Sequence, residues 1–268
     1  MDLIKINKIT VNFDANEKET AGLIAGACQR SIELAAECWG LSSPQDCRIF
    51  IMRSAIKFLF QSAPWSWRIY LGIALPLWYR QVNRIWQYAG AWTQRFGKRI
   101  VIGIKPPYMI EKSDQSIGVR LFVEEPDINK KIQQFTCHEL VHACSSHLRL
   151  PMWLNEGIAI VTVDRFVGEQ TVRMDTLDLI KNVSAHTQPP AQRELFKLDK
   201  EKIAYHTIRG YWLVKYIEEL HPGLLKNLFS QSPDSKSINE KIITALKMDP
   251  ATFWANIDEV LVRHFEDK

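Results

Sequence analysis

Two histidines spaced four residues apart, His138 and His142, constrain this chain more than any other feature. They belong to the segment C-H-E-L-V-H-A-C of residues 137–144. Positions i and i+4 of an α-helix project from one face, so two imidazoles at this spacing can bind one metal ion. The apolar residues before and around the pair recur at helical spacing, which predicts a helix from Asp127, its expected N-cap, to about Cys144.

Glu139 follows the first histidine and completes the pattern H-E-x-x-H. In zinc hydrolases with this pattern, the histidines bind the metal and the glutamate acts as general base toward a metal-activated water. A catalytic zinc site uses three protein ligands and keeps one position open, so a third ligand is needed. A chance match to so short a pattern is common enough across many proteins that the surrounding sequence must support it.

The segment P-M-W-L-N-E-G-I-A of residues 151–159 supplies that support. Together with the histidine motif it resembles the gluzincin metallopeptidases, peptidase MA-like zincins of the thermolysin and M1 aminopeptidase type, whose second motif reads W-L-N-E-G-x-A. The resemblance is strongest over residues 118–160. It implies a zincin, thermolysin-like catalytic domain, a Zn²⁺ cofactor, a peptide or protein substrate, and Glu156 as the third zinc ligand. Glu156 lies fourteen positions after His142, which allows a turn and a second helix that begins at Pro151.

Other potential ligands near the motif are disfavoured. His147 lies nine residues after His138, half a turn out of phase on a continuous helix. The metzincin pattern would also need a glycine and a histidine where this chain has Ser145 and Leu148. Cys137 and Cys144 share a different face of the helix from the histidines, and we expect them to be small residues of the buried core.

The same resemblance implies two further features of the site. An edge strand that pairs with an extended substrate is expected upstream, and Gly118–Val123 is the candidate. A tyrosine that stabilises the oxyanion is expected on a later helix, which we place at residues 204–217. Tyr205 is the first choice for this role, with Tyr211 and His206 as rivals, and an aromatic core stripe is the alternative interpretation of these residues.

The rest of the pattern predicts an α+β protein. Strands are expected at residues 3–14, 48–52 and 99–104, with a helix over 17–39 that stops at Gly40, so that the opening third forms a β-α-β unit. We expect two lobes. An N-terminal lobe of residues 1–174 would carry a mixed sheet, the H-E-x-x-H helix and a basic, tryptophan-rich insertion at about 54–98. A mostly helical lobe would follow over 175–268.

The insertion belongs to a segment with segregated charge. Between Cys47 and Ile110 there is no Asp or Glu, but there are ten Lys or Arg and five of the nine tryptophans, although the whole chain carries only +4. This segment can be a helical subdomain packed beside the cleft, or it can lie on an anionic membrane surface. The third interpretation is that the segment binds a nucleic acid or an acidic protein. The mild total charge of the chain does not favour binding to nucleic acid.

Localisation is predicted from what the sequence lacks. No secretory signal is visible, no run of eighteen apolar residues occurs, and five cysteines do not suggest a disulfide framework. We therefore expect a cytoplasmic protein, peripheral to a membrane under the second interpretation of the basic segment.

The expected function is that of a zinc metallopeptidase that uses Glu139 as general base. The alternative is a catalytically silent zincin-fold module that binds a partner or a membrane surface through residues 54–98. A third alternative directs the same zinc chemistry at a non-peptide amide. The sequence leaves the oligomeric state open.

Overall fold

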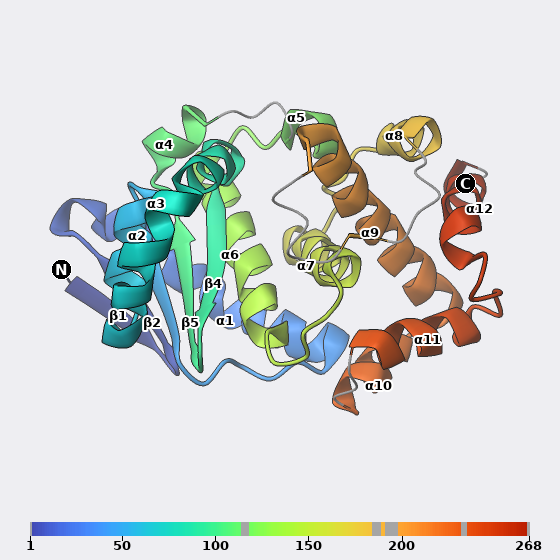
Figure 1. Cartoon of the computed structure of the whole chain (residues 1–268), viewed down its shortest axis with the longest axis horizontal. Coiled ribbons are helices and arrows are strands. Elements are labelled where there is room, and N and C mark those ends of the chain that lie inside the picture. Colours follow the sequence, from blue (N-terminus) through green and yellow to red (C-terminus); the bar gives the residue numbers. More distant parts are fainter. Residues whose placement is uncertain (1, 114–117, 184–188, 191–197, 232–234, 267–268) are drawn as a thin grey trace. The chain divides into compact units, whose positions relative to one another are not determined.

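The computed structural model of this protein describes residues 2–113, 118–183, 189–190, 198–231 and 235–266 (Figure 1). Contacts divide the chain into two units. Unit 1 consists of Met1–Glu33, Ser42–Gln115 and Glu124–Cys144, and unit 2 of Leu34–Leu41, Ser116–Val123 and Ser145–Lys268. The protein is of the α+β class. The sequence predicts a boundary between the lobes at 174/175. In the structure, the chain leaves unit 1 for the last time at 144/145, inside a helix.

The described strands of unit 1 form one mixed sheet in the order β1-β2-β3-β5-β4. Its strands are β1 (Asp2–Ile6), β2 (Ile9–Phe13), β3 (Cys47–Ile51), β4 (Ala91–Phe96) and β5 (Arg99–Ile104). β2, β3 and β5 run parallel in the centre, while β1 and β4 are antiparallel at the two edges. The strands predicted near 48–52 and 99–104 are confirmed. The single strand predicted over 3–14 is instead a hairpin that turns at Asn7, whose φ is 52°.

Helix α1 (Lys18–Trp39) connects β2 to the parallel strand β3, so the predicted β-α-β unit is confirmed. A 3₁₀ turn, Ala15–Glu17, precedes α1, and Gly40 ends it at a φ of 66° that favours glycine. The apolar face of the unit 1 part of α1 packs with the sheet and with residues of the later helix α6 in one buried cluster. This cluster includes Ile9, Val11, Ile24, Ile49, Ile102 and Leu140.

The basic segment contains α2 (Ala55–Ser62) and α3 (Trp65–Tyr88), followed by the hairpin of β4 and β5. α3 remains helical through Gly72 and Pro76. Its inner side, with Leu71, Leu75 and Val82, belongs to a second buried cluster. Phe58 of α2 and Val101 of β5 are members of the same cluster, so the two helices cover part of the sheet.

The segment between β5 and the histidine motif differs from the prediction. It contains α4 (Pro107–Glu111) and α5 (Gly118–Leu121), so the edge strand predicted at Gly118–Val123 is wrong. Among the described residues of this segment, only Phe122 forms an isolated bridge, to Val172. The physical reason lies in the burial pattern, since Leu121 is buried while Val119 and Val123 are about half exposed. The alternation that suggested a strand therefore has no buried face to support it.

Helix α6 (Ile128–Ser145) carries the histidine motif, as predicted. Asp127 caps it, because its Oδ1 accepts a hydrogen bond of 2.9 Å from the amide of Asn129. Helix α7 (Met152–Val167) follows after a short turn and begins directly after Pro151.

Unit 2 is helical in its described part. After α7 come α8 (Thr176–Val183), α9 (Lys200–Leu220), α10 (Leu224–Ser230), α11 (Ser235–Ala245) and α12 (Phe253–Glu266). α9 packs along α7 and also contacts α8, α10 and α12, so it is the central helix of the unit (Figure 1). The helix predicted over 204–217 is confirmed as part of α9. Among the described helices, we find none with the length and apolar character that crossing a bilayer requires.

Candidate metal centre

His138 and His142 face each other on α6. Their Nε2 atoms lie 3.0 Å apart, and their rings are 4.6 Å apart at an angle of 89°. Both side chains are half-buried. Two nitrogens bound at about 2.0–2.1 Å to one tetrahedral zinc ion would lie roughly 3.3 Å apart. The histidine pair therefore has nearly the spacing that shared coordination of one ion requires.

Glu156 on α7 completes a group of three residues that could hold a metal ion. One ligand atom from each of His138, His142 and Glu156 lies within 4.8 Å of the other two, and all three side chains are half-buried. Two imidazoles and one carboxylate are a donor set of catalytic zinc sites, which keep a further position open. The residues present thus fit the ion that the sequence predicts.

A short turn separates α6 from α7, the helix that carries Glu156. α6 ends at Ser145, and Arg149 adopts a left-handed φ of 49° just before α7 starts. The Ser145 hydroxyl donates a hydrogen bond of 2.8 Å to Oδ1 of Asn155, the residue that precedes Glu156. This bond joins the last residue of the histidine helix to the first turns of the glutamate helix and so limits where Glu156 can lie.

Gly157, the glycine of the W-L-N-E-G segment, is required by packing. A Cβ at Gly157 would lie 2.4 Å from the carbonyl oxygen of Gly210, and a Cβ at Gly210 would lie 2.2 Å from the carbonyl oxygen of Trp153. Both distances are shorter than side chains tolerate, so α7 and α9 approach each other this closely only because both positions are glycine. Trp153 itself is buried. The motif thus combines one of the three residues that could hold a metal ion with residues that fix the position of its helix.

Glu139, the predicted general base, is almost fully buried and is held by a residue that the sequence did not single out. Its Oε2 accepts a hydrogen bond of 2.5 Å from the hydroxyl of Thr93, which lies on the edge strand β4. No local pattern could have identified Thr93, because it lies 46 residues before Glu139 and belongs to no motif. Only the packing of β4 against α6 joins the two residues.

The three candidates for the oxyanion donor differ in their contacts. The Tyr205 hydroxyl donates to the Asp258 carboxylate, which also accepts a bond of 2.6 Å from Nε of the buried Arg209. The Tyr211 hydroxyl donates to Asp164 over 2.7 Å. The role of Tyr205 at an oxyanion stays a prediction, and its described hydroxyl contact is to an aspartate.

His206, the third candidate, is buried, and within the described part of the chain its Nδ1 has no hydrogen-bond partner. Burial, with a contribution from the nearby positive charge of Arg209, lowers the pKa of His206 to about 4. The ring is therefore neutral at pH 7.

The residues disfavoured as ligands lie where the sequence suggests. His147 is exposed and does not belong to the group of three. Cys137 and Cys144 are buried, as predicted for core residues. Burial also raises the pKa of the Cys144 thiol to about 12, so this thiol is protonated at pH 7 and is a poor metal ligand.

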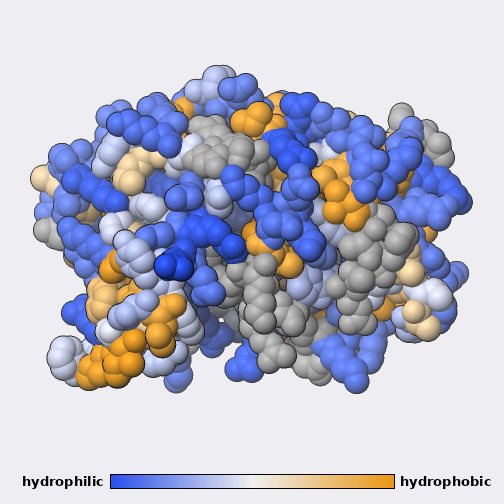
Figure 2. All heavy atoms as spheres, turned by 45° about the horizontal axis from the view of Figure 1, so that its top comes forward, coloured by the Kyte–Doolittle hydropathy of each residue, from blue (hydrophilic) through white to orange (hydrophobic). Residues whose placement is uncertain are grey.

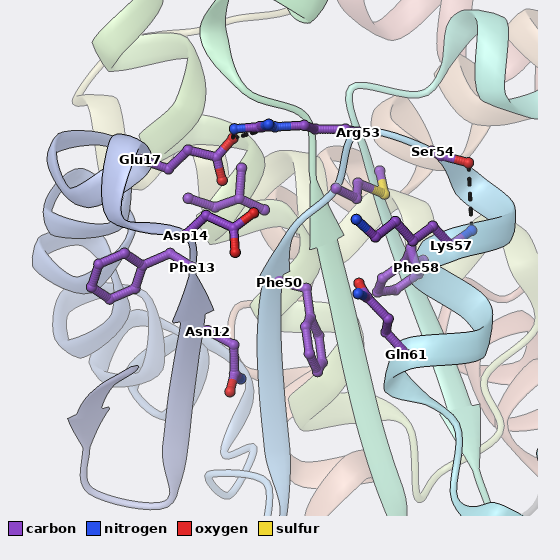
Figure 3. A pocket seen from close by; sticks show the side chains of 12 residues that line it. Asn12, Phe13, Asp14, Glu17, Phe50, Arg53, Ser54, Lys57, Phe58 and Gln61 are labelled. Carbon is purple, nitrogen blue, oxygen red and sulfur yellow. Dashed lines mark hydrogen bonds and ion pairs between the residues drawn. The ribbon is translucent and has the colours of Figure 1, made fainter. Parts of the chain in front are cut away.

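A small cavity in unit 1 lies outside this group of residues (Figure 3). It is formed where β2 and β3 end and where α2 begins, and its volume is about 60 Å³. Arg53 crosses its rim to bind the carboxylate of Glu17 at 2.7 Å. A space of this size holds a few waters at most, and none of its lining residues is a predicted ligand or base.

No family model matches this chain, and no curated protein matches it. The functional argument therefore rests on the ligand group, the contacts of Glu139 and general zinc chemistry.

Proposed function

We propose that this protein is a zinc-dependent metallopeptidase with a zincin-type fold. The observation that carries the proposal is the approach of one ligand atom each from His138, His142 and Glu156 to within 4.8 Å of one another. The buried Glu139 beside them supplies the carboxylate that metal-assisted hydrolysis needs. The expected β-sheet and the helical C-terminal part support the same assignment at the level of fold class.

The chain's own residues have distinct tasks in this proposal. When bound, Zn²⁺ would act as a Lewis acid and would lower the pKa of a coordinated water from that of bulk water to about 7. Glu139 removes a proton from the attacking water and passes it to the leaving amine. Thr93 keeps one carboxylate oxygen of Glu139 in place by its hydrogen bond, so that the other oxygen is available for the proton. The sequence gives three candidates for the donor to the developing oxyanion, Tyr205, Tyr211 and His206, and the bond of the Tyr205 hydroxyl to Asp258 favours a structural role for Tyr205.

The substrate is proposed to lie along β4 rather than along residues 118–123. β4 is the last strand in the order of the described sheet, and its Thr93 contacts the proposed base. An extended peptide that pairs with an edge strand gains main-chain hydrogen bonds regardless of its sequence. Pairing at β4 would place a peptide bond beside the residue that activates the nucleophile.

Turnover of a quenched peptide library tests the proposal. We expect hydrolysis that a chelator abolishes and that added zinc restores. Glu139→Gln should retain zinc and lose hydrolysis, because it keeps the shape of the side chain but removes the base, whereas His142→Ala should lose both. Full hydrolysis in Glu139→Gln would contradict the mechanism. Zinc binding without turnover of any peptide would favour a silent binding module or a non-peptide amide substrate.

A further inference from the structure

Helix α3 exposes an apolar row on the side that faces away from its buried cluster. Trp65, Ile69, Ile73 and Leu77 follow one another at four-residue intervals, which places them along one side of the helix. Ile73 is 73% exposed and Leu77 is 81% exposed, and Trp65 is 76% exposed. The row extends over about 18 Å of helix. Isolated exposed apolar residues are ordinary, but a continuous row of this length marks an interaction surface.

Hydrophobic side chains gather in one patch at the lower left of the face drawn in Figure 2, on the side of the view where α3 lies in Figure 1. The aromatic residues Tyr70, Trp78 and Tyr79 on α3 are also about half exposed. Three of the five tryptophans of the basic segment, Trp65, Trp67 and Trp78, are therefore not core residues.

The charges on α3 and in the segment of the chain that contains it are of one sign. Arg80 and Arg84 lie three and seven residues after Leu77, on the same side of the helix as the apolar row, and both are exposed. The segment from Cys47 to Ile110 that contains α3 has ten basic residues and no acidic one. The outward face of α3 is thus apolar in its first half and cationic in its second half.

This combination fits an anionic lipid surface better than a protein or a nucleic acid. A second copy of the chain pairing α3 with α3 would bring like charges together, because the segment offers no carboxylate to oppose Arg80 and Arg84. Nucleic-acid binding would use the arginines but would leave Ile73 and Leu77 exposed to water. Helices that lie in a bilayer interface combine aliphatic and aromatic residues with Lys and Arg.

We propose that the outward face of α3 docks this protein on a bilayer surface that contains anionic phospholipids. Ile69, Ile73 and Leu77 enter the boundary between headgroups and acyl chains, and the half-exposed aromatic rings lie at headgroup level. Arg80 and Arg84 bind the lipid phosphates. The helix lies along the surface and does not cross it. This docking is independent of the proposed hydrolysis.

Co-sedimentation of the full chain with vesicles tests this proposal. We expect binding to phosphatidylcholine vesicles that contain phosphatidylserine, binding at least about tenfold weaker to pure phosphatidylcholine, and loss of binding at high salt, since each basic residue near an anionic surface contributes about fivefold and salt screens it. The double variant Ile73→Glu/Leu77→Glu should lower the partition coefficient by at least about tenfold, because two carboxylates replace two inserted side chains. Arg80→Gln should weaken binding to the anionic vesicles only.

The matched control is Val119→Glu/Val123→Glu, which adds the same two carboxylates at exposed valines outside α3 and should bind like the parent chain. The substituted residues of both double variants are exposed, and circular dichroism would verify that each variant is folded. Absence of binding to the anionic vesicles at low salt would overturn the proposal. Equal loss in the two double variants would also overturn it, because the effect would then follow net charge and not α3. The proposal would also be overturned if the parent chain is a dimer in solution and the double variant Ile73→Glu/Leu77→Glu is a monomer.

Discussion

The hydroxyl of Thr93 donates a hydrogen bond of 2.5 Å to Oε2 of Glu139, although the two residues lie 46 positions apart in the chain. Thr93 stands on the edge strand of the sheet and Glu139 on the helix that carries both histidines. The same hydroxyl also lies 3.3 Å from the Glu139 carbonyl oxygen. The proposed base is therefore positioned by the sheet, while the proposed metal ligands come from the two consecutive helices.

Replacement of Thr93 by valine tests this positioning. Thr93→Val keeps the shape of the side chain but removes the donor, so kcat for peptide hydrolysis should fall by about 10- to 100-fold, as for other outer contacts of metal sites. The bound zinc should change little because no ligand is altered, and KM should change little because an edge strand pairs with a peptide through its main chain, which the substitution leaves in place. Thr93→Ser retains the hydroxyl and is the control. If Thr93→Val hydrolyses peptides like the parent chain, the contact has no role in catalysis.

Removal of the third ligand should release the metal. Glu156→Ala leaves two histidines, and we expect its zinc affinity to fall by more than about 100-fold, since loss of a mere outer contact already costs 10- to 100-fold. Competition with a chelating dye measures this affinity. His147→Ala, at an exposed histidine close to the motif, should bind zinc like the parent chain. If His147→Ala lowers the zinc affinity and Glu156→Ala does not, the third ligand is His147 and not Glu156.

The contact between α7 and α9 predicts a strong effect of a small substitution. Gly210→Ala would place a Cβ 2.2 Å from the carbonyl oxygen of Trp153, and the helices must move apart. We expect a loss of about 2 kcal/mol or more in the free energy of unfolding, measured by urea denaturation. Gly22→Ala, in an open helical position of α1, should instead stabilise by about 0.5–1 kcal/mol. Equal effects at both positions would argue against the close approach.

Tyr205→Phe separates a structural role from a catalytic one. The Tyr205 hydroxyl bonds to Asp258 beside Arg209, so its removal should lower the free energy of unfolding by about 1–3 kcal/mol. We expect kcat of the folded variant to stay within about threefold of the parent value. A fall in kcat of about 10²–10³ would instead show that Tyr205 is the oxyanion donor implied by the family resemblance.

The buried imidazole of His206 predicts a dependence of stability on pH. Its pKa is about 4 in the folded chain, below its ordinary value of 6.5, so the unfolded chain binds a proton first as the pH falls. Stability should therefore decrease between pH 6.5 and 4, by up to about 3 kcal/mol from this group alone. His206→Phe cannot titrate and should lose less stability over this interval. If the free energy of unfolding changes equally with pH in the parent chain and in His206→Phe, His206 is not the group responsible.

The local features of the fold could be predicted because they depend on nearby residues. The β-α-β unit, the N-cap at Asp127 and the stop at Gly40 follow from apolar spacing and capping chemistry, and the structure has all three. The grouping of His138, His142 and Glu156 was also predicted, and its three ligand atoms do lie close together. The histidines share one helix face, and one short turn leads to the glutamate.

Features that depend on long-range packing could not be predicted. The order of the strands, and hence the place of β4 at the edge, depends on pairing between distant segments. The sequence therefore suggested Gly118–Val123 as the edge strand, where the structure has α5 and exposed valines. The partner of Glu139 was missed for the same reason. Which aromatic residues of α3 face outward likewise depends on the cluster that its other side joins.

The hydrogen bond from Ser145 to Asn155 has a consequence for folding order. All three proposed metal ligands lie between His138 and Glu156, a short stretch of the chain that closes at low entropic cost. The base, by contrast, depends on a strand from much earlier in the chain. If the proposed function holds, a preparation in which the sheet is frayed would retain zinc but would not hydrolyse peptides, so zinc content alone would not measure the active fraction.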